Sequence, residues 1–302
     1  MLNKGNSRKE RPVSGADART ELRAEVARKV ALFIGSAESL ASDVPGLTLY
    51  RHIAPTRSAA ATYEPSVAVV VQGRKQVELG ANTFVYDGSR YLLTALDLPV
   101  VSRVVEASSQ TPYLCLRLKL EMEAVREVLG QGDFELRLIA PDAPAMTTAE
   151  TTVEFLGAVD RLLDLLNAPE DIPFLSPLLQ RELIYRILKS AAGQRLRAIA
   201  TTGDQSYRTA RVIAFIKANY AKTLRVEDLA QIAGMSMSTL HHHFRALTSM
   251  SPLQYQKQLR LQAAQQRMLI EGLDAASALF RSGMKAQVNS IANTAVFSGY
   301  RR

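Results

Sequence analysis

The segment 224–247 constrains the fold more than any other, because apolar residues at helical spacing lie on both sides of one glycine. Those before the glycine are four residues apart, and those after it recur at spacings of four and three. Gly234 supplies the backbone freedom that a sharp turn between two helices needs. We therefore predict a helix-turn-helix over residues 226–247. Its expected core consists of Leu229, Ala233, Gly234, Met235, Leu240, Phe244 and Leu247.

The outer face of the second predicted helix carries short polar and basic side chains. Such groups reach base edges and phosphates when a helix enters the major groove of DNA. Ser236 is expected to cap the helix at its start. Two packed helices with a glycine turn also occur in ordinary protein cores, so the pattern alone is only moderately specific. The candidate DNA-binding residues are Ser236, Met237, Ser238, Thr239, His242 and Arg245.

The net charge of +8 is confined to the end of the chain that holds this pattern. Residues 1–204 carry 24 Lys and Arg against 25 Asp and Glu, a net charge of −1, whereas residues 205–302 carry 13 against 4, a net charge of +9. A basic module of this kind attracts a polyanion, either nucleic acid or an anionic membrane surface. A solvated basic face is the alternative that charge alone leaves open. Together with the helix-turn-helix pattern, the charge favours double-stranded DNA.

Histidine and cysteine are too few and too scattered to predict a metal centre. The chain has one cysteine, Cys115, and its only histidine before residue 241 is His52. The run 241–243 is three consecutive histidines, which point about 100° apart on a helix, whereas helical metal ligands need spacings of three or four. We therefore expect no metal, no cofactor and no catalytic residue, although carboxylates alone could hold a weakly bound oxygen-liking ion.

Upstream, the periodicity changes from helical to alternating. Leu22, Val26, Val30 and Phe33 predict one amphipathic helix that ends near Gly35. Between residues 47 and 120, six β-rich runs are separated by turn formers, which favours a small antiparallel sandwich or barrel. In the last run, leucines 114, 116, 118 and 120 share a face expected to be buried, while residues 115, 117 and 119 share one expected to be wet. The runs are 66–71, 76–79, 83–86, 91–94, 100–105 and 113–120.

Two further amphipathic helices follow within residues 151–198 and predict a helical hairpin. The first carries an apolar stripe from about Val153, and the second is expected to open at Ser176, with Pro177 as its first helical residue. The hairpin either covers the sheet or pairs with a second subunit. Because its stripes are wider than sheet coverage requires, we expect it to mediate dimerisation.

The start of the chain and the length of its apolar runs indicate a cytoplasmic protein. Residues 1–16 are polar and lack periodicity, so we expect a disordered leader rather than a signal peptide. The longest purely aliphatic run, 67–71, is far shorter than a membrane span. No membrane partner is therefore expected.

The helix-turn-helix segment and the residues after it resemble the DNA-binding domain of AraC/XylS-type transcriptional regulators. The similarity lies in residues 229–230, 233–236, 240, 244–245, 248–255, 259–264 and 268–269. The resemblance implies two helix-turn-helix units joined by a long helix, here about 252–270. The family's usual glycine before the Ser-Pro turn is replaced by Ser249 or Met250.

The resemblance extends upstream through residues 66–75, 90–94 and 97–100, which are similar to the cupin-type amino-terminal domain of one AraC subgroup. It implies an α+β chain with an N-terminal antiparallel, cupin-like β-barrel flanked by helices and a C-terminal all-α helix-turn-helix domain. The cupin-like sensor and dimerisation domain, which includes the hairpin 151–198, would occupy 17–200, and the DNA-binding domain would occupy 205–302.

The second helix-turn-helix unit is expected to be disrupted. Residues 274–283 resemble its first helix and turn, with Ala276, Leu279 and Phe280 expected to be buried. The residues after Gly283 have weak helical periodicity and no basic side chain between Lys285 and Arg301. Codons can be chosen for this tail so that a neighbouring frame reads Glu-Ser-Pro-Ser-Gln-Phe-Asn-Arg-Glu-Tyr-Arg-Arg-Leu-Phe-Gly, which resembles the family's missing helix. We therefore predict a shift of reading frame, and a divergent but folded second unit is the alternative.

These observations predict a sequence-specific, DNA-binding transcription regulator that is not an enzyme. A small-molecule effector bound in the N-terminal domain, RNA polymerase and a second copy of the chain are candidate partners. The alternative is a cupin-fold enzyme or small-molecule-binding protein with a basic helical appendage. The residues offer no clustered histidines, Ser/His/Asp set or phosphate loop in its support.

Overall fold

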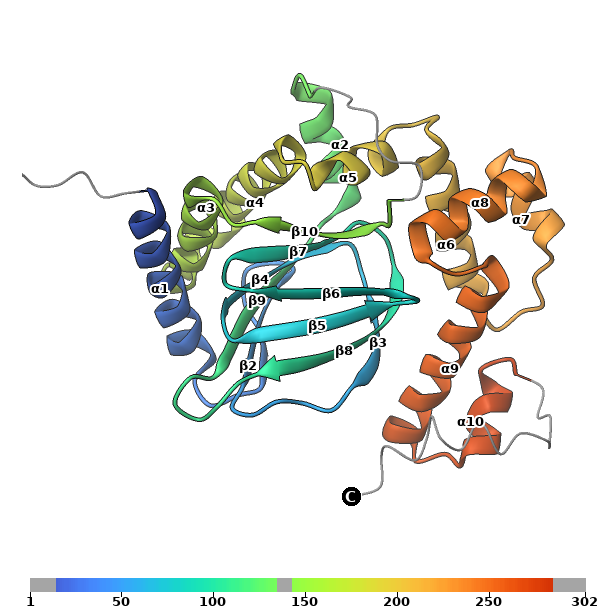
Figure 1. The fold of residues 1–302 in the computed structure, drawn as a ribbon, viewed down its shortest axis with the longest axis horizontal. Helices are drawn as coiled ribbons and strands as arrows, with labels where there is room; N and C mark the ends of the chain where they lie inside the picture. Colours follow the sequence, from blue (N-terminus) through green and yellow to red (C-terminus); the bar gives the residue numbers. More distant parts are fainter. Residues whose placement is uncertain (1–14, 135–142, 285–302) are drawn as a thin grey trace, which may run out of the picture.

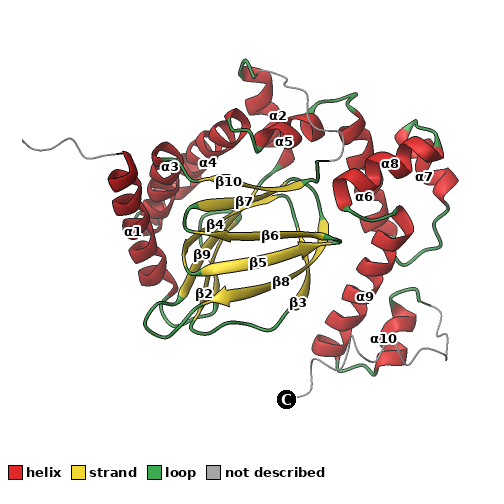
Figure 2. Ribbon diagram, in the orientation of Figure 1, coloured by secondary structure: helices red, strands yellow, loops and turns green. Residues whose placement is uncertain are grey.

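The computed structural model describes residues 15–134 and 143–284, which form a strand-rich part followed by a helical part (Figure 1). Helices α1, α3 and α4 lie along one side of the strands, and α6 to α10 lie beyond the opposite side (Figure 2). This arrangement confirms the predicted α+β class, with an antiparallel sheet region and a C-terminal all-helical region. In the described ranges no helix is both long and apolar enough to cross a membrane.

The strand-rich part consists of two antiparallel sheets. The first has the strand order β1-β2-β9-β4-β7-β10 and the second β3-β8-β5-β6. The six expected runs correspond to β4–β9, and the sequence analysis did not delimit the other four strands. The strands are β1 (Ser39–Ala41), β2 (Leu47–His52), β3 (Ala59–Tyr63), β4 (Ser66–Gln72), β5 (Arg74–Leu79), β6 (Asn82–Asp87), β7 (Arg90–Thr94), β8 (Leu98–Glu106), β9 (Tyr113–Lys119) and β10 (Met146–Glu150).

Strand β9 is buried on both faces, which corrects the expectation of one wet face. Leu114, Leu116 and Leu118 are buried as predicted, but Cys115 is also only 3% exposed and Arg117 is half-buried. The reason is that Arg117 and Cys115 face the interior between the two sheets, whereas the leucines face the helical cover. Only Lys119, at the strand's end, is exposed on the Cys115 face.

The helices of the N-terminal part cover the outer face of the first sheet. Helix α1 begins at Gly15, so the last two residues of the expected leader are helical, and residues 1–14 lie outside the described residues. The ring of Tyr91 on β7 stacks on Phe155 of α3 with 4.6 Å between centroids. The Tyr91 hydroxyl lies 3.1 Å from Ser190 Oγ. These helices are α1 (Gly15–Ile34), α2 (Met122–Gln131), α3 (Val153–Asp164), α4 (Ile172–Lys189) and α5 (Gly193–Ala200).

The second helix of the expected hairpin begins earlier than predicted. Helix α4 starts at Ile172, so Ser176 lies inside the helix and is buried rather than capping it, and Pro177 is an interior helical residue. The earlier start places Ile172 in the core, where it is 6% exposed, and a proline already occupies the first turn. Pro177 therefore indicated the correct helix, but the helix begins about one turn earlier than Pro177 predicts.

The C-terminal part is entirely helical over its described residues. It contains α6 (Gln205–Asn219), α7 (Val226–Ala233), α8 (Met237–Thr248), α9 (Pro252–Glu271) and α10 (Ala275–Arg281). In α10 the expected burial is wrong at two positions, because Ala276 is exposed and Phe280 is 73% exposed, while Ala278 is buried. Helix α10 packs chiefly against α9. The tail 285–302 lies outside the described residues.

Candidate nucleic-acid interface

Helices α7 and α8 meet at a sharp turn centred on Gly234. This glycine has φ 61° and ψ 42°, the left-handed conformation that glycine adopts without steric cost. The amide of Met235 donates to the carbonyl of Ala230 at 3.0 Å, which closes the turn. Helix α8 then starts with Ser236 as its N-cap, whose Oγ accepts from the amide of Thr239 at 3.2 Å. The two helices therefore have the connection expected of a helix-turn-helix.

The inner faces of the two helices form a small apolar core. Leu229, Leu240 and Phe244 are fully buried, and the ring of Phe244 lies edge-on to Tyr255 of α9 with centroids 5.5 Å apart. Met235 is half-buried at the corner. This core fixes which side of α8 points away from the protein.

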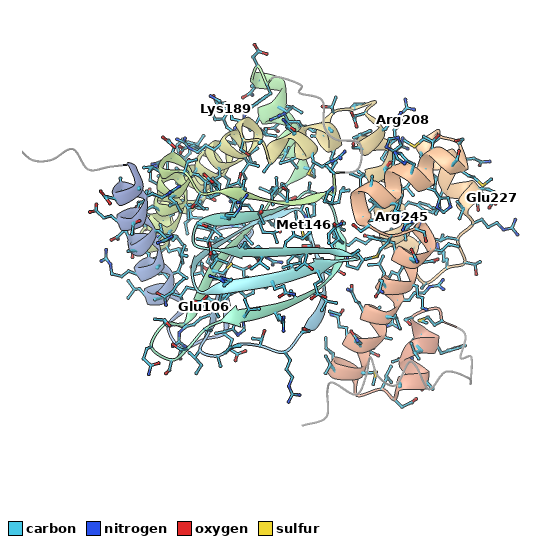
Figure 3. All side chains as sticks on the ribbon, viewed as in Figure 1. Glu106, Met146, Lys189, Arg208, Glu227 and Arg245 are labelled. Carbon is cyan, nitrogen blue, oxygen red and sulfur yellow. The ribbon has the colours of Figure 1, made fainter. Side chains whose placement is uncertain are left out.

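The opposite face of α8 carries the candidate DNA-binding residues. Met237 is 48% exposed, and Ser236, Ser238, His242 and Arg245 are also exposed. Thr239 is half-buried because its hydroxyl lies against the cap. Figure 3 labels Arg245 on α8. All six candidates thus lie along the first three turns of one helix.

Three hydroxyl groups gather at the start of α8. Ser236 Oγ lies 3.0 Å from Ser238 Oγ and 2.8 Å from Thr239 Oγ1. Exposed hydroxyls and free amides at a helix N-terminus suit a phosphate oxygen. The sequence analysis chose these residues individually, but only the structure brings the three hydroxyls together.

The three histidines of α8 point in different directions, as their spacing predicts. His242 and His243 contact each other edge-on with ring centroids 5.2 Å apart, and His241 is exposed. Burial, followed by the neighbouring His242, lowers the pKa of His243 below its ordinary value. Throughout the described ranges, no three histidine, cysteine or acidic residues gather as a metal site.

The long helix α9 holds the helix-turn-helix in place. It opens with a capping box in which Ser251 and Gln254 satisfy each other's backbone amides. Gln256 Nε2 donates to the carbonyls of Tyr220 and Lys222, at 2.8 and 2.7 Å, so that α9 is tied to the segment before α7. Ser249, one of the two residues named for the family's usual glycine, has φ 59° and is the single non-glycine residue with positive φ in the described chain. The turn therefore keeps the glycine conformation with a serine.

Ser249 also contacts the strand-rich part of the molecule. Asn82 Nδ2, at the start of β6, donates to Ser249 Oγ at 2.8 Å. Gly80, in the turn between β5 and β6, lies so close that a Cβ placed on it would be 2.8 Å from Ser249 Cβ. The tip of the β5–β6 hairpin reaches toward the junction of α8 and α9 in Figure 1. Helix α8 is thus held at its C-terminal end by the β-sheet region.

Charged and polar contacts extend this docking along α6 and α9. Lys217 Nζ lies 2.6 Å from Asp97 Oδ1 and 3.2 Å from Glu64 Oε1. Burial opposes the charge of Lys217, but its bonds to both carboxylates outweigh burial and raise its pKa. The Tyr255 hydroxyl donates to the carbonyl of Asp97 at 2.7 Å, and Gln262 Nε2 donates to the carbonyl of Ala61 at 2.9 Å.

Additional exposed cations lie on the helical part and were not singled out by sequence reasoning. Arg208 and Arg211 on α6 are exposed, as are Lys222 and Arg225 before α7. Their exposure could not be read from charge alone, although the excess of Lys and Arg over residues 205–302 was the available signal. Figure 3 labels Arg208 beyond α8, on the helical part of the molecule.

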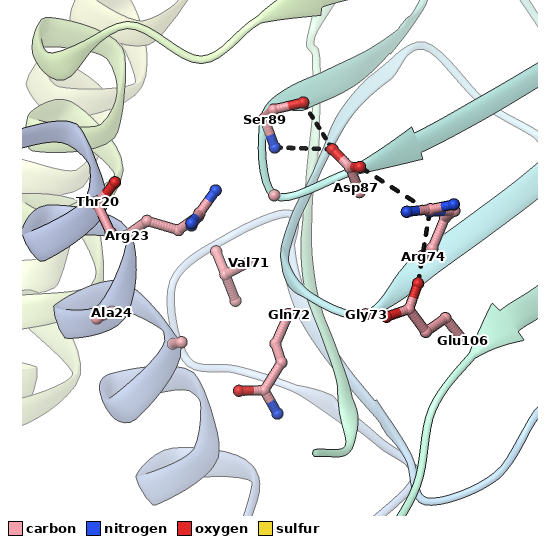
Figure 4. Close-up of a pocket in the computed structure, with 12 residues that line it drawn as sticks. Thr20, Arg23, Ala24, Val71, Gln72, Gly73, Arg74, Asp87, Ser89 and Glu106 are labelled. Carbon is pink, nitrogen blue, oxygen red and sulfur yellow. Dashed lines mark hydrogen bonds and ion pairs between the residues drawn. The ribbon is translucent and has the colours of Figure 1, made fainter. Parts of the chain in front are cut away.

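Two surface pockets lie away from α8. The larger has a volume of about 440 Å³ and opens between α1 and one end of the sheets (Figure 4). Its charges are largely paired within the wall, since Arg74 Nε lies 3.5 Å from Glu106 and 3.9 Å from Asp87. The second, of about 230 Å³, lies between the two parts of the molecule and is lined by Asp97, Arg126 and Tyr207 among others.

Two family profiles match this chain, one over its N-terminal part and one over its helix-turn-helix. The profile of the AraC-type transcriptional regulator N-terminus matches residues 43–195, about half of the chain, and a helix-turn-helix domain profile matches residues 229–293. The chain belongs to the AraC-type transcriptional regulators. It is therefore a DNA-binding transcription regulator and not an enzyme, which removes the alternative of a cupin-fold enzyme with a basic appendage.

Three solved structures are similar to this chain at low sequence identity. ToxT from Vibrio cholerae O395 has a TM-score of 0.49 at 9% identity, with 78% of this chain and 86% of that chain covered. Wild-type ToxT of V. cholerae strain SCE256 with a bound unsaturated fatty acid has a TM-score of 0.47 at 9% identity and the same coverage. The AraC-like transcriptional activator CuxR has a TM-score of 0.30 at 13% identity, with 79% and 82% covered. A comparison with curated proteins found no significant match.

Proposed function

We propose that this AraC-type regulator binds duplex DNA through the exposed face of α8. Ser236, Met237, Ser238, Thr239, His242 and Arg245 would supply the principal contacts. The observation that carries this assignment is the division of α8 into a fully buried face around Leu240 and Phe244 and an opposite exposed face with hydroxyls and Arg245. A helix of this kind presents base-reading side chains to the major groove while the hydroxyls at its start meet phosphates.

The test measures how salt changes the affinity for a fluorescent DNA duplex selected from genomic fragments. Arg245→Ala should weaken binding by about 1–3 kcal/mol if Arg245 reads a base, or reduce the salt slope by about one if it neutralises a phosphate. Arg103→Ala is the matched control, because Arg103 is exposed on β8 in the N-terminal part. Unchanged affinity and slope in Arg245→Ala contradict the proposed contacts.

The proposed active form is a homodimer that uses the helical pair α3 and α4, within the expected 151–198 hairpin. The apolar face of helix α3 covers the sheet. Helix α4, in contrast, has large apolar side chains on its surface: Phe174 is 76% exposed, Leu178 is 54% exposed and Tyr185 is 43% exposed. Their spacings of four and seven place them on one face of the helix. A second copy would cover this face and align two recognition helices with paired half-sites.

A small molecule bound in the N-terminal domain is the proposed input, and RNA polymerase is the proposed recipient of the output. The contacts at Asn82, Asp97 and Ala61 couple the two parts of the chain, so a change in the sheet region would reach α9 and α8. The proposed location is the cytoplasm, where a one-component regulator meets both its effector and DNA.

A further inference from the structure

The exposed face of α8 has two histidines at its centre. Residues at positions i, i+3, i+4 and i+7 share one side of an α-helix. Four exposed side chains occupy such positions on α8: Ser238, His241, His242 and Arg245. We refer to these four residues as the exposed stripe. His241, which sequence reasoning did not choose, therefore lies on the same surface as the candidate DNA contacts.

The third histidine of the run, His243, lies on a different side of the helix. It is half-buried, and burial, followed by the neighbouring His242, lowers its pKa. The two rings meet edge-on with 5.2 Å between centroids. Two positive charges this close together would repel each other. His243 therefore stays neutral, while the exposed His242 keeps the capacity to accept a proton.

In the described part of the chain, no carboxylate forms an ion pair with either histidine of the exposed stripe. Helices α6, α7 and α9 pack against α8 and could supply one. Asp204, at the N-cap of α6, acts on His243 instead. Glu227 and Asp228 are exposed in the first turn of α7, and Glu271 of α9 pairs with an arginine of α10. The two histidines therefore have no negative partner in the free protein.

Positive charge, in contrast, is already present beside them. Arg245 lies four residues after His241 and three after His242, spacings at which side chains on a helix are neighbours. Arg195 of α5 adds a further positive charge near His243. Like charges at these spacings disfavour each other. A proton on either exposed histidine is therefore unfavourable in the free chain and becomes favourable when an anion faces the stripe.

We propose that His241 and His242 take up protons when α8 binds DNA, so that the affinity for DNA rises as the pH falls from about 8 to about 6. A neutral imidazole offers one donor and one acceptor, whereas an imidazolium offers two donors and a positive charge. Phosphate oxygens and the O6 and N7 atoms of guanine accept hydrogen bonds and favour the charged form. This proposal rests on the proposed function, because DNA on this face supplies the negative charge.

The direction of the effect follows from the linkage between proton binding and DNA binding. Histidine ordinarily titrates near pH 6.5, at about the middle of the physiological range. The additional affinity is therefore complete below that pH and is lost as the pH rises above it. Each protonated histidine also displaces counterions from the DNA, so the salt slope should be steeper at low pH by about 0.9 per histidine.

The test uses the full chain and the fluorescent duplex selected from genomic fragments, at constant salt and between about pH 6 and pH 8. We expect the affinity to fall by about tenfold or more across this range. Glutamine forms hydrogen bonds but cannot become charged, so His241→Gln and His242→Gln should each remove part of this fall and the double variant most of it. His241→Arg carries a charge at every pH and should flatten the profile by keeping its affinity at high pH.

The two remaining histidines provide matched controls. His52 lies on β2 in the N-terminal part, and His243 lies off the exposed stripe. His52→Gln and His243→Gln should both keep the full pH dependence of DNA binding. Circular dichroism at each pH checks that every variant is folded. Calorimetry in buffers of different protonation enthalpy counts the protons taken up on binding, which should fall to near zero in the double variant.

An affinity that does not change with pH, a pH dependence that survives in the double variant, or one that disappears in His52→Gln overturns the proposal. In each of these cases the duplex is still bound, so the proposed function stands. Absence of binding at every pH would remove the proposed function and this proposal together.

Discussion

A methyl group added at Gly80 should separate the two parts of this regulator, and the structure supplies its own control. Gly80 has φ +58°, and a Cβ built on it would lie 2.8 Å from Ser249 Cβ and 3.0 Å from Ser249 O. Gly35 has φ +57° with nothing within 4 Å of its added Cβ. Both Gly→Ala changes incur a left-handed strain of about 1–2 kcal/mol, reduced by about 0.4–1 kcal/mol because alanine restricts the unfolded chain.

Only Gly80→Ala adds an overlap, and overpacking of this kind costs about 1–3 kcal/mol unless the neighbours separate. If the two parts move apart, the Asn82–Ser249 hydrogen bond is lost. The backbone hydrogen bond of 2.9 Å from the Ala145 amide to the Leu247 carbonyl is weakened, and each bond contributes about 1 kcal/mol. The overlap and the lost bonds are therefore similar in size, so the docked form should become much less populated.

Hydrogen exchange at the Ala145 amide and protease cleavage between the two parts measure this population. We expect faster exchange and cleavage in Gly80→Ala and no change in Gly35→Ala, while both variants lose similar thermal stability in the N-terminal part. Equal exchange in the two variants would show that Gly80 does not hold the helical part in place.

Three further changes test other parts of the account. Leu240→Asp should unfold the helix-turn-helix and abolish DNA binding, because Leu240 is fully buried, whereas Leu253→Asp at a 49% exposed position of α9 should bind normally by fluorescence anisotropy. The double change Phe174→Asp and Leu178→Asp should give a monomer by light scattering, and a dimer of unchanged affinity would exclude this face of α4. Burial and His242 lower the pKa of His243, so the unfolded chain takes up the proton first as pH falls below the ordinary value of 6.5. Stability should therefore decrease with acidification through that range and less so in His243→Gln, and identical pH profiles of unfolding would contradict it.

The helix-turn-helix was predictable because its signals are local. Gly234, the cap at Ser236 and the apolar spacing after it specify the turn and both helices within some 20 residues. The strands β4–β9 were predictable for the same reason, since alternation and turn residues delimit them. Strands β1, β2, β3 and β10 were not delimited. Alanines fill most of β3, and β10 forms by pairing with β7, about 55 residues away in the chain.

The sequence could not specify which part of the protein, or solvent, packs against each face of a strand or helix. The face of β9 that carries Cys115 and Arg117 alternates as a solvent-facing strand does, yet the second sheet covers it. The same limit applies to the docking of α9, because Gln262 meets Ala61 across 201 residues of chain. A local pattern gives the direction of a side chain, and only tertiary structure tells whether water or protein receives it.

The shift of reading frame expected after Gly283 stays a prediction, because the tail 285–302 lies outside the described residues. Leu269 is 69% exposed, Ile270 is 74% exposed and Phe280 is 73% exposed, all on α9 and α10. A second recognition helix would cover apolar side chains at such positions. The recognition helix of a second helix-turn-helix would follow α10 directly, at the residues where the altered tail begins.

Sequencing the gene around codon 283 tests the prediction, since a neighbouring frame should encode a continuation similar to Glu-Ser-Pro-Ser-Gln-Phe-Asn-Arg-Glu-Tyr-Arg-Arg-Leu-Phe-Gly. Restoring that frame should reduce exposure of Phe280 to a hydrophobic dye and steepen the salt dependence of DNA binding, because a second unit adds phosphate contacts. If no frame encodes such a helix, the shift is wrong. The exposed residues would then belong to a divergent second unit, and a chain that ends after Gly283 should bind DNA less tightly than the full chain.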